Sequence, residues 1–188
     1  LYPGHPVMPE LAFYQCHDCH HSMASLRWQP EGGPDALPPG TVRLNDGPLT
    51  VLMTATDTLG WASSAELENG WNQLHRASQT SVADLQAEAA KLVDMLEPMI
   101  EIALDTRVSA DDQRALRLQL LDDAAAGRYR HFTAAELAFL AVESLSINLG
   151  DEGTFKQSMD NCYQTLADED AFSPQKFALS ARSVRKAL

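Results

Sequence analysis

Two cysteines and a histidine near the N-terminus are the residues best spaced to do chemistry. Cys16 and Cys19 are separated by two residues, and His20 follows directly, so residues 16–20 read C-x-x-C-H. Two thiols three positions apart on a helical turn share one face, where each can add to one haem vinyl group and form a thioether bond. The adjacent imidazole of His20 then lies under the ring and can bind the iron. This is the pattern of c-type haem attachment, and it predicts one covalently bound haem c.

A zinc site is the main alternative for the same residues. The two cysteines and two of the histidines among residues 17–21 are ligand types that tetrahedral zinc accepts. Ligands so close in sequence rarely all close on one ion, and zinc sites usually take a second pair from a distant segment. The chain has no second C-x-x-C and no H-x₃-H, and its third cysteine, Cys162, stands alone in the sequence. A thioredoxin-like thiol pair would need a βαβ context, which the sequence does not predict.

The segment around the motif resembles the haem-binding segments of multihaem c-type cytochromes. The likeness covers about the first 25 residues, in which Gly4-His5-Pro6 precedes the motif and His21-Ser22-Met23 follows it. In that class, an extra histidine after or upstream of C-x-x-C-H often serves as the second ligand of the same haem or of a neighbouring one. The chain departs from the class because it has a single C-x-x-C-H. The resemblance therefore implies a one-haem protein, or one part of a longer chain or complex.

The second axial ligand sets the potential of a bound iron and decides between a carrier and an enzyme. His75 is the first choice, because it shares one stripe of a predicted helix with Trp71, and an imidazole on an apolar face needs a partner. The alternative for His75 is a core histidine with a backbone hydrogen bond. His5 is the runner-up, since its Gly- and Pro-rich segment could fold back over the haem or reach one in a partner. Trp28, Trp61 and Trp71 could pack on a haem, with ordinary core packing as the alternative.

The composition of the chain changes near residue 48. Residues 1–48 hold eight of the ten prolines and five of the ten glycines, so we expect an irregular arm there. Residues 49–188 are rich in Ala, Leu, Gln and Glu, and nearly lack the alternation of Val, Ile and Thr that is typical of strands. We therefore predict an all-α protein, in which a haem-attachment arm (1–48) precedes a helical bundle (49–188) that packs on the haem.

Start and stop signals divide the C-terminal part into seven predicted helices. Their expected starts are Asp46-Gly47-Pro48, Trp61, Ser81, Ser109, the capping box Thr133–Glu136, Thr154 and Ser173-Pro174. Gly127 and Gly150 are expected to end the fourth and fifth helices. Pro98 should kink or split the third helix, because proline removes one main-chain donor from the helix.

Charge and composition limit the classes of partner. The 188 residues carry a formal net charge of −12, and 45% of them are hydrophobic. The negative charge disfavours nucleic acid and anionic membranes, and favours a basic redox partner protein or other haem-containing subunits. No apolar run reaches the roughly 18 residues of a membrane-spanning helix, so an integral membrane protein is not expected. The chain begins at Leu1 without an initiator Met, which we interpret as a processed chain or a fragment.

The motif and its resemblance together predict electron transfer through one haem c. Two protein ligands on the iron would favour a carrier over an enzyme. Because haem c is attached outside the cytoplasm in bacteria, the resemblance implies a periplasmic or otherwise extracytoplasmic location. Two alternatives stay open: a haem c enzyme or gas sensor with an open distal site, and a non-haem zinc-binding module whose helices dock a partner. The sequence has no P-loop, G-x-G-x-x-G, Ser-His-Asp or H-E-x-x-H signature.

Overall fold

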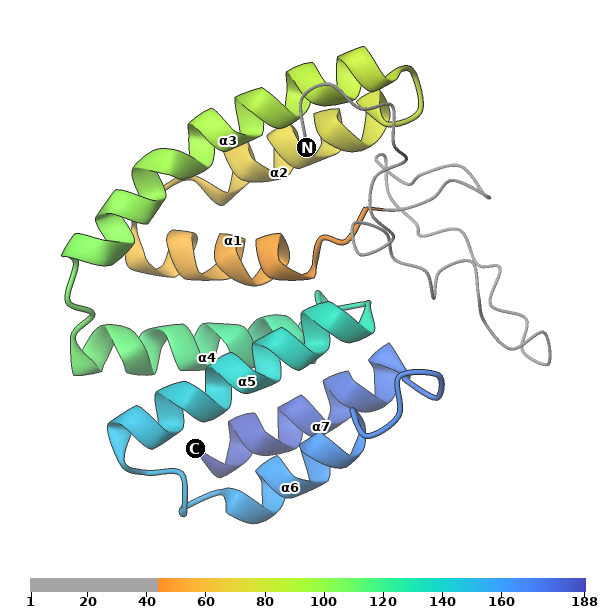
Figure 1. Ribbon diagram of the computed structural model, residues 1–188. Helices are drawn as coiled ribbons and strands as arrows, with labels where there is room; N and C mark the ends of the chain where they lie inside the picture. The colour runs from red at the N-terminus through yellow and green to blue at the C-terminus, as the bar shows by residue number, and fades with distance from the viewer. Residues whose placement is uncertain (1–43) are drawn as a thin grey trace. The chain divides into compact units, whose positions relative to one another are not determined.

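The computed structural model of the protein describes residues 44–188, where every regular element is a helix and no strand is present. The helices, drawn in Figure 1, are α1 (Gly47–Leu59), α2 (Ser64–Ala77), α3 (Val82–Asp105), α4 (Ala110–Ala126), α5 (Phe132–Leu149), α6 (Lys156–Gln164) and α7 (Pro174–Ala187). The prediction of an all-α protein is confirmed for this part of the chain. The predicted irregular arm lies outside it, except for its last few residues.

The described residues fall into two compact units. The first, called here the hairpin unit, contains Leu44, Asn45 and residues 65–98, which include most of α2 and the N-terminal part of α3. The second, called the bundle unit, contains residues 46–64 and 99–188, and therefore α1 and α4 to α7. The boundary that we predicted at residue 48 stays a prediction, because its N-terminal side lies outside the described residues.

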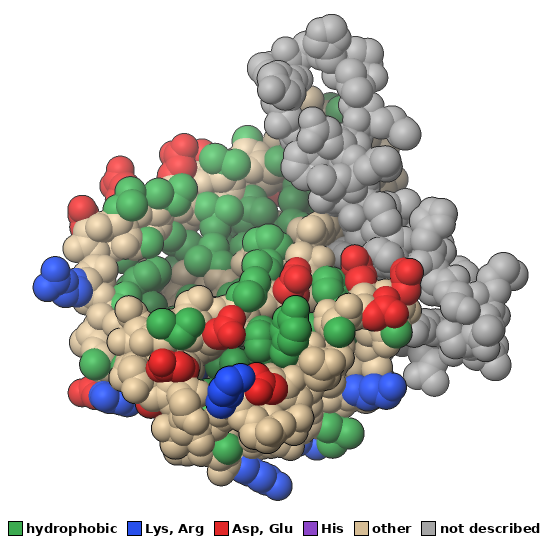
Figure 2. Space-filling model, turned by 60° about the horizontal axis from the view of Figure 1, so that its bottom comes forward, with side chains coloured by type: hydrophobic (Ala, Val, Ile, Leu, Met, Phe, Trp, Pro, Cys, Tyr) green, Lys and Arg blue, Asp and Glu red, His purple; other side chains and the backbone are tan. Residues whose placement is uncertain are grey.

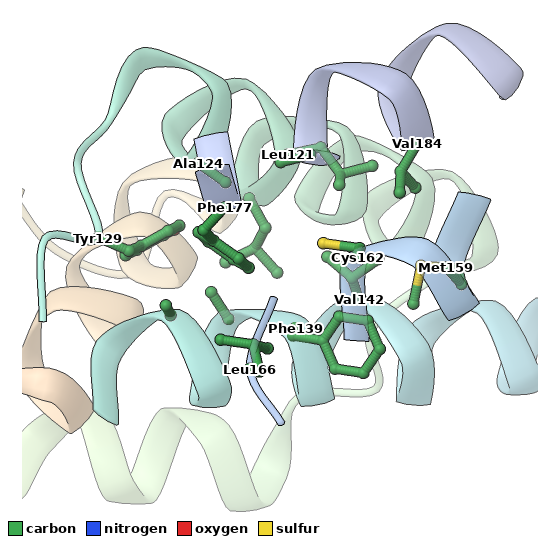
Figure 3. Packing of buried hydrophobic residues seen from close by; sticks show 14 of the residues in the cluster. Leu121, Ala124, Tyr129, Phe139, Val142, Met159, Cys162, Leu166, Phe177 and Val184 are labelled. Carbon is green, nitrogen blue, oxygen red and sulfur yellow. The ribbon is translucent and has the colours of Figure 1, made fainter. Parts of the chain in front are cut away.

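The bundle unit is organised around α4, which packs against α1, α5 and α7, while α6 packs against α7. Its core joins aliphatic and aromatic side chains from four helices, among them Leu120, Val142, Met159 and Phe177 (Figure 3). The start of α1 lies against α5, because a Cβ on Gly47 would lie only 3.0 Å from the main-chain nitrogen of Ala134. A side chain at this position would force the two helices apart.

Helix ends in the bundle unit follow the predicted signals at four positions. Ser109 caps α4 by accepting a hydrogen bond from the main-chain N–H of Asp112 at 3.1 Å, and Ser173 caps α7 in the same way. Gly127 and Gly150 end α4 and α5 with φ of 82° and 71°, the left-handed conformation that glycine adopts without strain. These local signals are therefore confirmed.

Three predicted helix starts are wrong. The helix α2 begins at Ser64, later than the expected start at Trp61. The helix α5 begins at Phe132 with His131 as its N-cap residue, so the capping box expected from Thr133 is not formed. The helix α6 begins at Lys156, later than the expected start at Thr154. For Pro98 we expected a kink or a split of the third helix; α3 runs unbroken through Pro98, so the split does not occur, and the kink stays a prediction. Pro98 lies on the exposed side of the helix, where water can satisfy the carbonyl that proline leaves without a donor.

In the hairpin unit, α2 and α3 lie side by side (Figure 1). Gly70 permits this close approach, because a Cβ there would lie 3.3 Å from both Leu92 Cδ1 and Met95 Sδ. The buried apolar residues of the unit's described part are Leu44, Leu67, Leu74, Ala77 and Leu92. One face of each helix is thus buried, and this packing fixes the direction of the α2 side chains.

The helix α5 is long and apolar enough, by length and composition alone, to cross a membrane: its 18 residues have a mean hydropathy of 1.3. In the bundle unit its face with Ala135, Ala138 and Val142 is buried in the core, and 33% of the helix is buried. A core helix meets the same criterion of length and hydropathy. The expectation that the protein is not an integral membrane protein therefore stays a prediction.

Candidate haem site

The predicted haem-attachment residues lie outside the described part of the chain. Cys16, Cys19 and the proximal ligand His20 all precede Leu44, and so does His5, the second choice for the distal ligand. The structure therefore leaves these four assignments as predictions. His75, the first choice for the distal ligand, lies in the hairpin unit, and its surroundings can be described.

His75 lies in the last turn of α2 and is only 4% exposed. Its Nε2 accepts a hydrogen bond from the main-chain N–H of Leu44, with 3.1 Å between the nitrogens. A ring nitrogen that accepts a hydrogen bond carries no proton, so this arrangement requires the neutral form of the imidazole. The contact is the one expected of a core histidine satisfied by the backbone. Iron binding through Nε2 would have to replace it, and His75 as a haem ligand stays a prediction.

Trp71 lies one turn before His75 on α2. The two rings pack edge to face, with their centroids 4.4 Å apart and their planes at 82°. The predicted stripe on α2 is confirmed: Leu67 and His75 are buried and Trp71 is half-buried. The indole Nε1 of Trp71 is itself buried and has no hydrogen-bond acceptor among residues 44–188.

The surroundings of Trp71 suit the edge of a haem in one respect, which is the hydrogen-bond donor of the indole. A haem carries two propionate carboxylates, which are hydrogen-bond acceptors, on a largely apolar ring. An indole offers an apolar face and a single N–H donor, so the unused donor of Trp71 beside the His75 ring suits such a group.

The other candidate ligands in the described part fill the core. Met53, Met99 and Met159 are at most 8% exposed and fill the core. Cys162 is 2% exposed, and burial raises the pKa of its thiol to about 12, so it stays protonated at neutral pH. Among residues 44–188, no three His, Cys, Asp or Glu side chains are placed to hold a metal ion. A zinc site would therefore need at least one ligand from the residues before Leu44.

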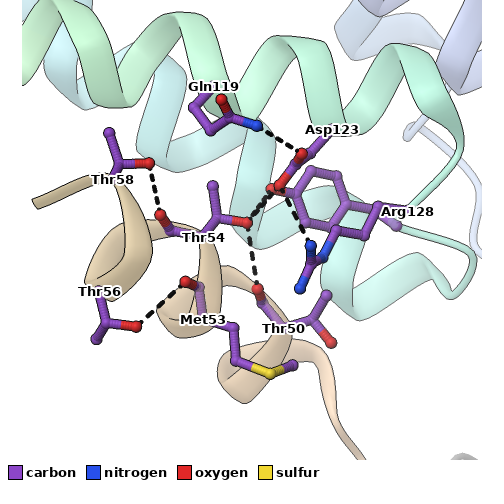
Figure 4. A network of polar contacts seen from close by, with 9 residues as sticks. Thr50, Met53, Thr54, Thr56, Thr58, Gln119, Asp123 and Arg128 are labelled. Carbon is purple, nitrogen blue, oxygen red and sulfur yellow. Dashed lines mark hydrogen bonds and ion pairs between the residues drawn. The ribbon is translucent and has the colours of Figure 1, made fainter. Parts of the chain in front are cut away.

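A polar network joins α1 to α4 inside the bundle unit (Figure 4). Thr54 Oγ1 donates to Asp123 Oδ2 at 2.7 Å, and the hydroxyl of Tyr129, 3.1 Å away, donates to Thr54. Gln119 donates to the other oxygen of Asp123 at 2.8 Å. Tyr129 is 1% exposed, and burial raises the pKa of its phenol far above the usual value. The network stabilises the contact between the two helices, and nothing in it is arranged for catalysis.

A second polar cluster surrounds Arg117, which is 4% exposed. Its Nη2 donates to Asp151 Oδ2 at 2.9 Å and its Nη1 to Ser146 Oγ at 3.1 Å, and the guanidinium lies 5.4 Å from the centroid of the Phe155 ring. The hydrogen bond from Arg117 lowers the pKa of the Asp151 carboxyl. The sequence analysis missed this pair, because 34 residues separate its members and neither has a local motif.

Acidic and basic side chains are interspersed on the face of the molecule in Figure 2, and neither sign forms a continuous patch there. Two ion pairs of the bundle unit are Lys156 with Asp160, 2.8 Å apart, and Arg185 with Asp122, also 2.8 Å apart. Exposed pairs of this kind contribute little to stability. The excess negative charge of the chain is therefore not concentrated on this face.

Comparisons with known proteins give no family for the chain. No family model, no curated protein and no solved structure matches it.

Proposed function

We propose that the chain is an electron-transfer protein with one covalently bound haem c, either a c-type cytochrome or a haem-bearing part of a multihaem cytochrome. The observation that carries the proposal is the C-x-x-C-H motif formed by Cys16, Cys19 and His20. In the motif's favour over zinc, the sequence has no second C-x-x-C and no H-x₃-H to supply the distant ligand pair that zinc sites usually use.

Each residue of the motif has a distinct role in this proposal. Cys16 and Cys19 hold the porphyrin through thioether bonds, and His20 provides the proximal imidazole. When bound, the haem supplies one-electron chemistry, which no protein side chain here provides. The chain anchors the ring, orients it and excludes water from its edge. The helices after residue 48 act as scaffold and docking surface.

The distal ligand is His75 or, as runner-up, His5. For His75 to bind through Nε2, the hydrogen bond from Leu44 must be released. His5 lies outside the described residues. Two histidine ligands would close both faces of the iron and favour a carrier over an oxygen- or peroxide-binding site.

The partner and the cellular location that we propose follow from the net charge of the chain and from the chemistry of haem attachment. A net charge of −12 would steer a basic redox partner, with an association rate that falls steeply as salt is added. Haem c attachment implies an extracytoplasmic location, which is periplasmic in a Gram-negative cell. Other haem-containing subunits are the natural partners if the chain is part of a larger assembly.

Visible spectroscopy on the haem-loaded protein tests the proposal. We expect a haem that survives acid–acetone extraction and gives sharp α and β bands on reduction, unchanged by carbon monoxide. Bands that shift with carbon monoxide would instead indicate an enzyme or gas sensor with an open distal site. Absence of covalent haem would overturn the proposal, and a zinc assay would then test the alternative.

The same spectra assign the distal ligand. His75→Phe and His5→Phe should differ: the variant that lacks the ligand gives a high-spin spectrum that responds to carbon monoxide, and the other does not. His131→Gln, at the N-terminus of α5, is the matched control for loss of a histidine elsewhere.

A further inference from the structure

The helix α3 carries two apolar stripes, and the fold buries one of them while the other stays largely exposed. Leu92 and Met99 belong to the buried stripe and are 7% and 8% exposed. Val93 and Ile100 each follow one of these residues directly, so they lie about 100° further round the helix. They are 51% and 58% exposed. Single exposed apolar residues are common, but a row of them along one helix indicates a surface that binds a partner.

The exposed stripe has the spacing of a coiled coil. Its first six positions are Val82, Gln86, Ala89, Val93, Leu96 and Ile100. They follow one another at alternating intervals of four and three residues, and Gln86 is the one polar member. Ala103 is the next position of the repeat, and Leu104 beside it is 80% exposed. Because α3 is one continuous helix, these positions share a face through helix geometry alone. An apolar row that alternates in this way over about three heptads is typical of a helix that packs against another helix.

The two halves of α3 differ in charge. The C-terminal half has no Lys or Arg and carries four carboxylates, those of Asp94, Glu97, Glu101 and Asp105. The N-terminal half carries only two carboxylates, and both have partners. Glu88 pairs with Lys91 at 2.7 Å. Asp84 accepts hydrogen bonds from the hydroxyls of Thr80 and Ser81. Two α3 helices in parallel would place acidic halves side by side, whereas an antiparallel pair sets each acidic half against the less charged half of the other helix.

A second α3 is the partner that fits both the repeat and the charges. It has the same heptad spacing along its whole length, and in antiparallel orientation it adds little negative charge beside the acidic half of the first helix. A basic helix of another protein would find carboxylates to pair with along only half of the stripe, because those of the N-terminal half already have partners. A contact that uses the same patch on both chains closes at two copies.

We propose that the α3 helices of two copies of the chain pair in antiparallel orientation through this stripe and make the protein a dimer. The dimer goes beyond the proposed function and does not require the haem, because every residue of the stripe belongs to α3. The net charge of −12 on each chain opposes association, so the apolar contact holds the dimer together and added salt tightens it.

Sedimentation equilibrium of the full chain measures this association. We expect twice the mass of one chain at micromolar concentration, and a dissociation constant that falls as salt is added. The double variant Val93→Glu/Ile100→Glu should sediment as a monomer with unchanged helical circular dichroism, because both side chains are exposed. Leu179→Glu, at a residue 60% exposed on α7, is the control and should remain a dimer. The proposal is overturned by a monomeric wild type, by a dimer that salt weakens, or by a dimer that the double variant leaves intact.

Position 86 provides a second test, in which the variant strengthens the contact. Gln86→Leu makes this position of the repeat apolar and should lower the dissociation constant by about 10-fold or more, because each chain buries one more leucine in the contact. Ala87→Leu adds a leucine at the next residue, which is also exposed but lies off the stripe, and should leave the dissociation constant unchanged. Equal dissociation constants for the two variants would contradict the proposed stripe.

Discussion

The bundle unit and the hairpin unit differ in how many apolar side chains their described residues bury. In the bundle unit, α4 to α7 bury a continuous apolar cluster, and the charge of buried Arg117 is compensated by Asp151 of the same unit. In the described part of the hairpin unit, only the facing sides of two helices are buried. Two helices alone bury too little apolar surface to be independently stable. The comparison teaches that the two described helices of the hairpin unit carry much less of the buried core than the bundle unit does.

Truncation of the bundle core should have the largest effect. Phe177 is 2% exposed and contacts Phe172, with ring centroids 6.3 Å apart. We expect Phe177→Ala to lower the free energy of unfolding by about 3–5 kcal/mol, measured by denaturant titration of helical circular dichroism. The haem spectrum should not change if the hairpin unit holds the haem. The control Leu179→Ala, at a residue 60% exposed on the same helix, should change stability by less than about 0.5 kcal/mol.

Loss of the proposed haem should speed main-chain amide exchange in the hairpin unit and leave exchange in the bundle unit unchanged. In a Cys16→Ser/Cys19→Ser chain, we expect main-chain amides of α2 to exchange on the order of 100-fold faster, because local opening no longer breaks haem contacts. Amides of α4 and α7 should keep their protection, since their core lies within the bundle unit. Hydrogen exchange read by mass spectrometry gives both values in one sample. Equal loss of protection in α2 and α4 would remove the distinction between the two units.

The Arg117–Asp151 pair should give a smaller effect with a defined pH dependence. Asp151→Asn leaves the buried guanidinium uncompensated and should cost about 1–3 kcal/mol at pH 7, a value reduced because the Asp151 side chain is 36% exposed. The pKa of Asp151 is lowered below its ordinary value of 3.8, so the carboxylate stabilises the folded state above this value. This stability is lost as the pH falls through the lower, folded-state pKa.

Thermal unfolding of the wild type and Asp151→Asn at several pH values tests this sign. The difference between them should be constant above about pH 5 and shrink below pH 4. Asp111→Asn removes an exposed pair with Arg114 in the same region of α4 and should change stability by less than about 0.5 kcal/mol. A difference that grows on acidification would contradict the assignment of the shift to Asp151.

The N-cap of α4 should have the smallest effect. Ser109→Ala removes the acceptor for the main-chain N–H of Asp112 and should destabilise the bundle unit by about 1 kcal/mol. Ser183→Ala, at an exposed position inside α7, is the matched control and should be neutral or slightly stabilising, because alanine favours helix interiors. Similar losses in the two variants, compared by thermal melts, would mean that the cap contributes nothing of its own.

Features set by neighbouring residues could be predicted from the sequence, and those set by distant contacts could not. Ser109, Ser173, Gly127 and Gly150 act within one turn of their helices, so their patterns located those ends. The start of α5 was misplaced because its N-cap, His131, makes no side-chain capping bond and has no capping sequence signal.

In the candidate site, too, the sequence predicts what neighbouring residues determine and misses what distant contacts determine. The periodicity of α2 placed His75 and Trp71 on one face, which the structure bears out. The partner of His75 could not be predicted, because Leu44 is 31 residues away and donates only a main-chain N–H. Main-chain groups carry no residue-specific signal, so only the folded chain shows the contact. The attachment motif, by contrast, is entirely local and was found without any structure.

The intact mass of the full chain, produced in a host that attaches haem c, tests the central claim most directly. Our account predicts that the denatured wild-type chain carries the added mass of one haem, and that Cys16→Ser/Cys19→Ser carries none while Cys162→Ser still carries one. A wild-type chain at the mass of the bare polypeptide, under conditions in which a known c-type cytochrome is loaded, would contradict it.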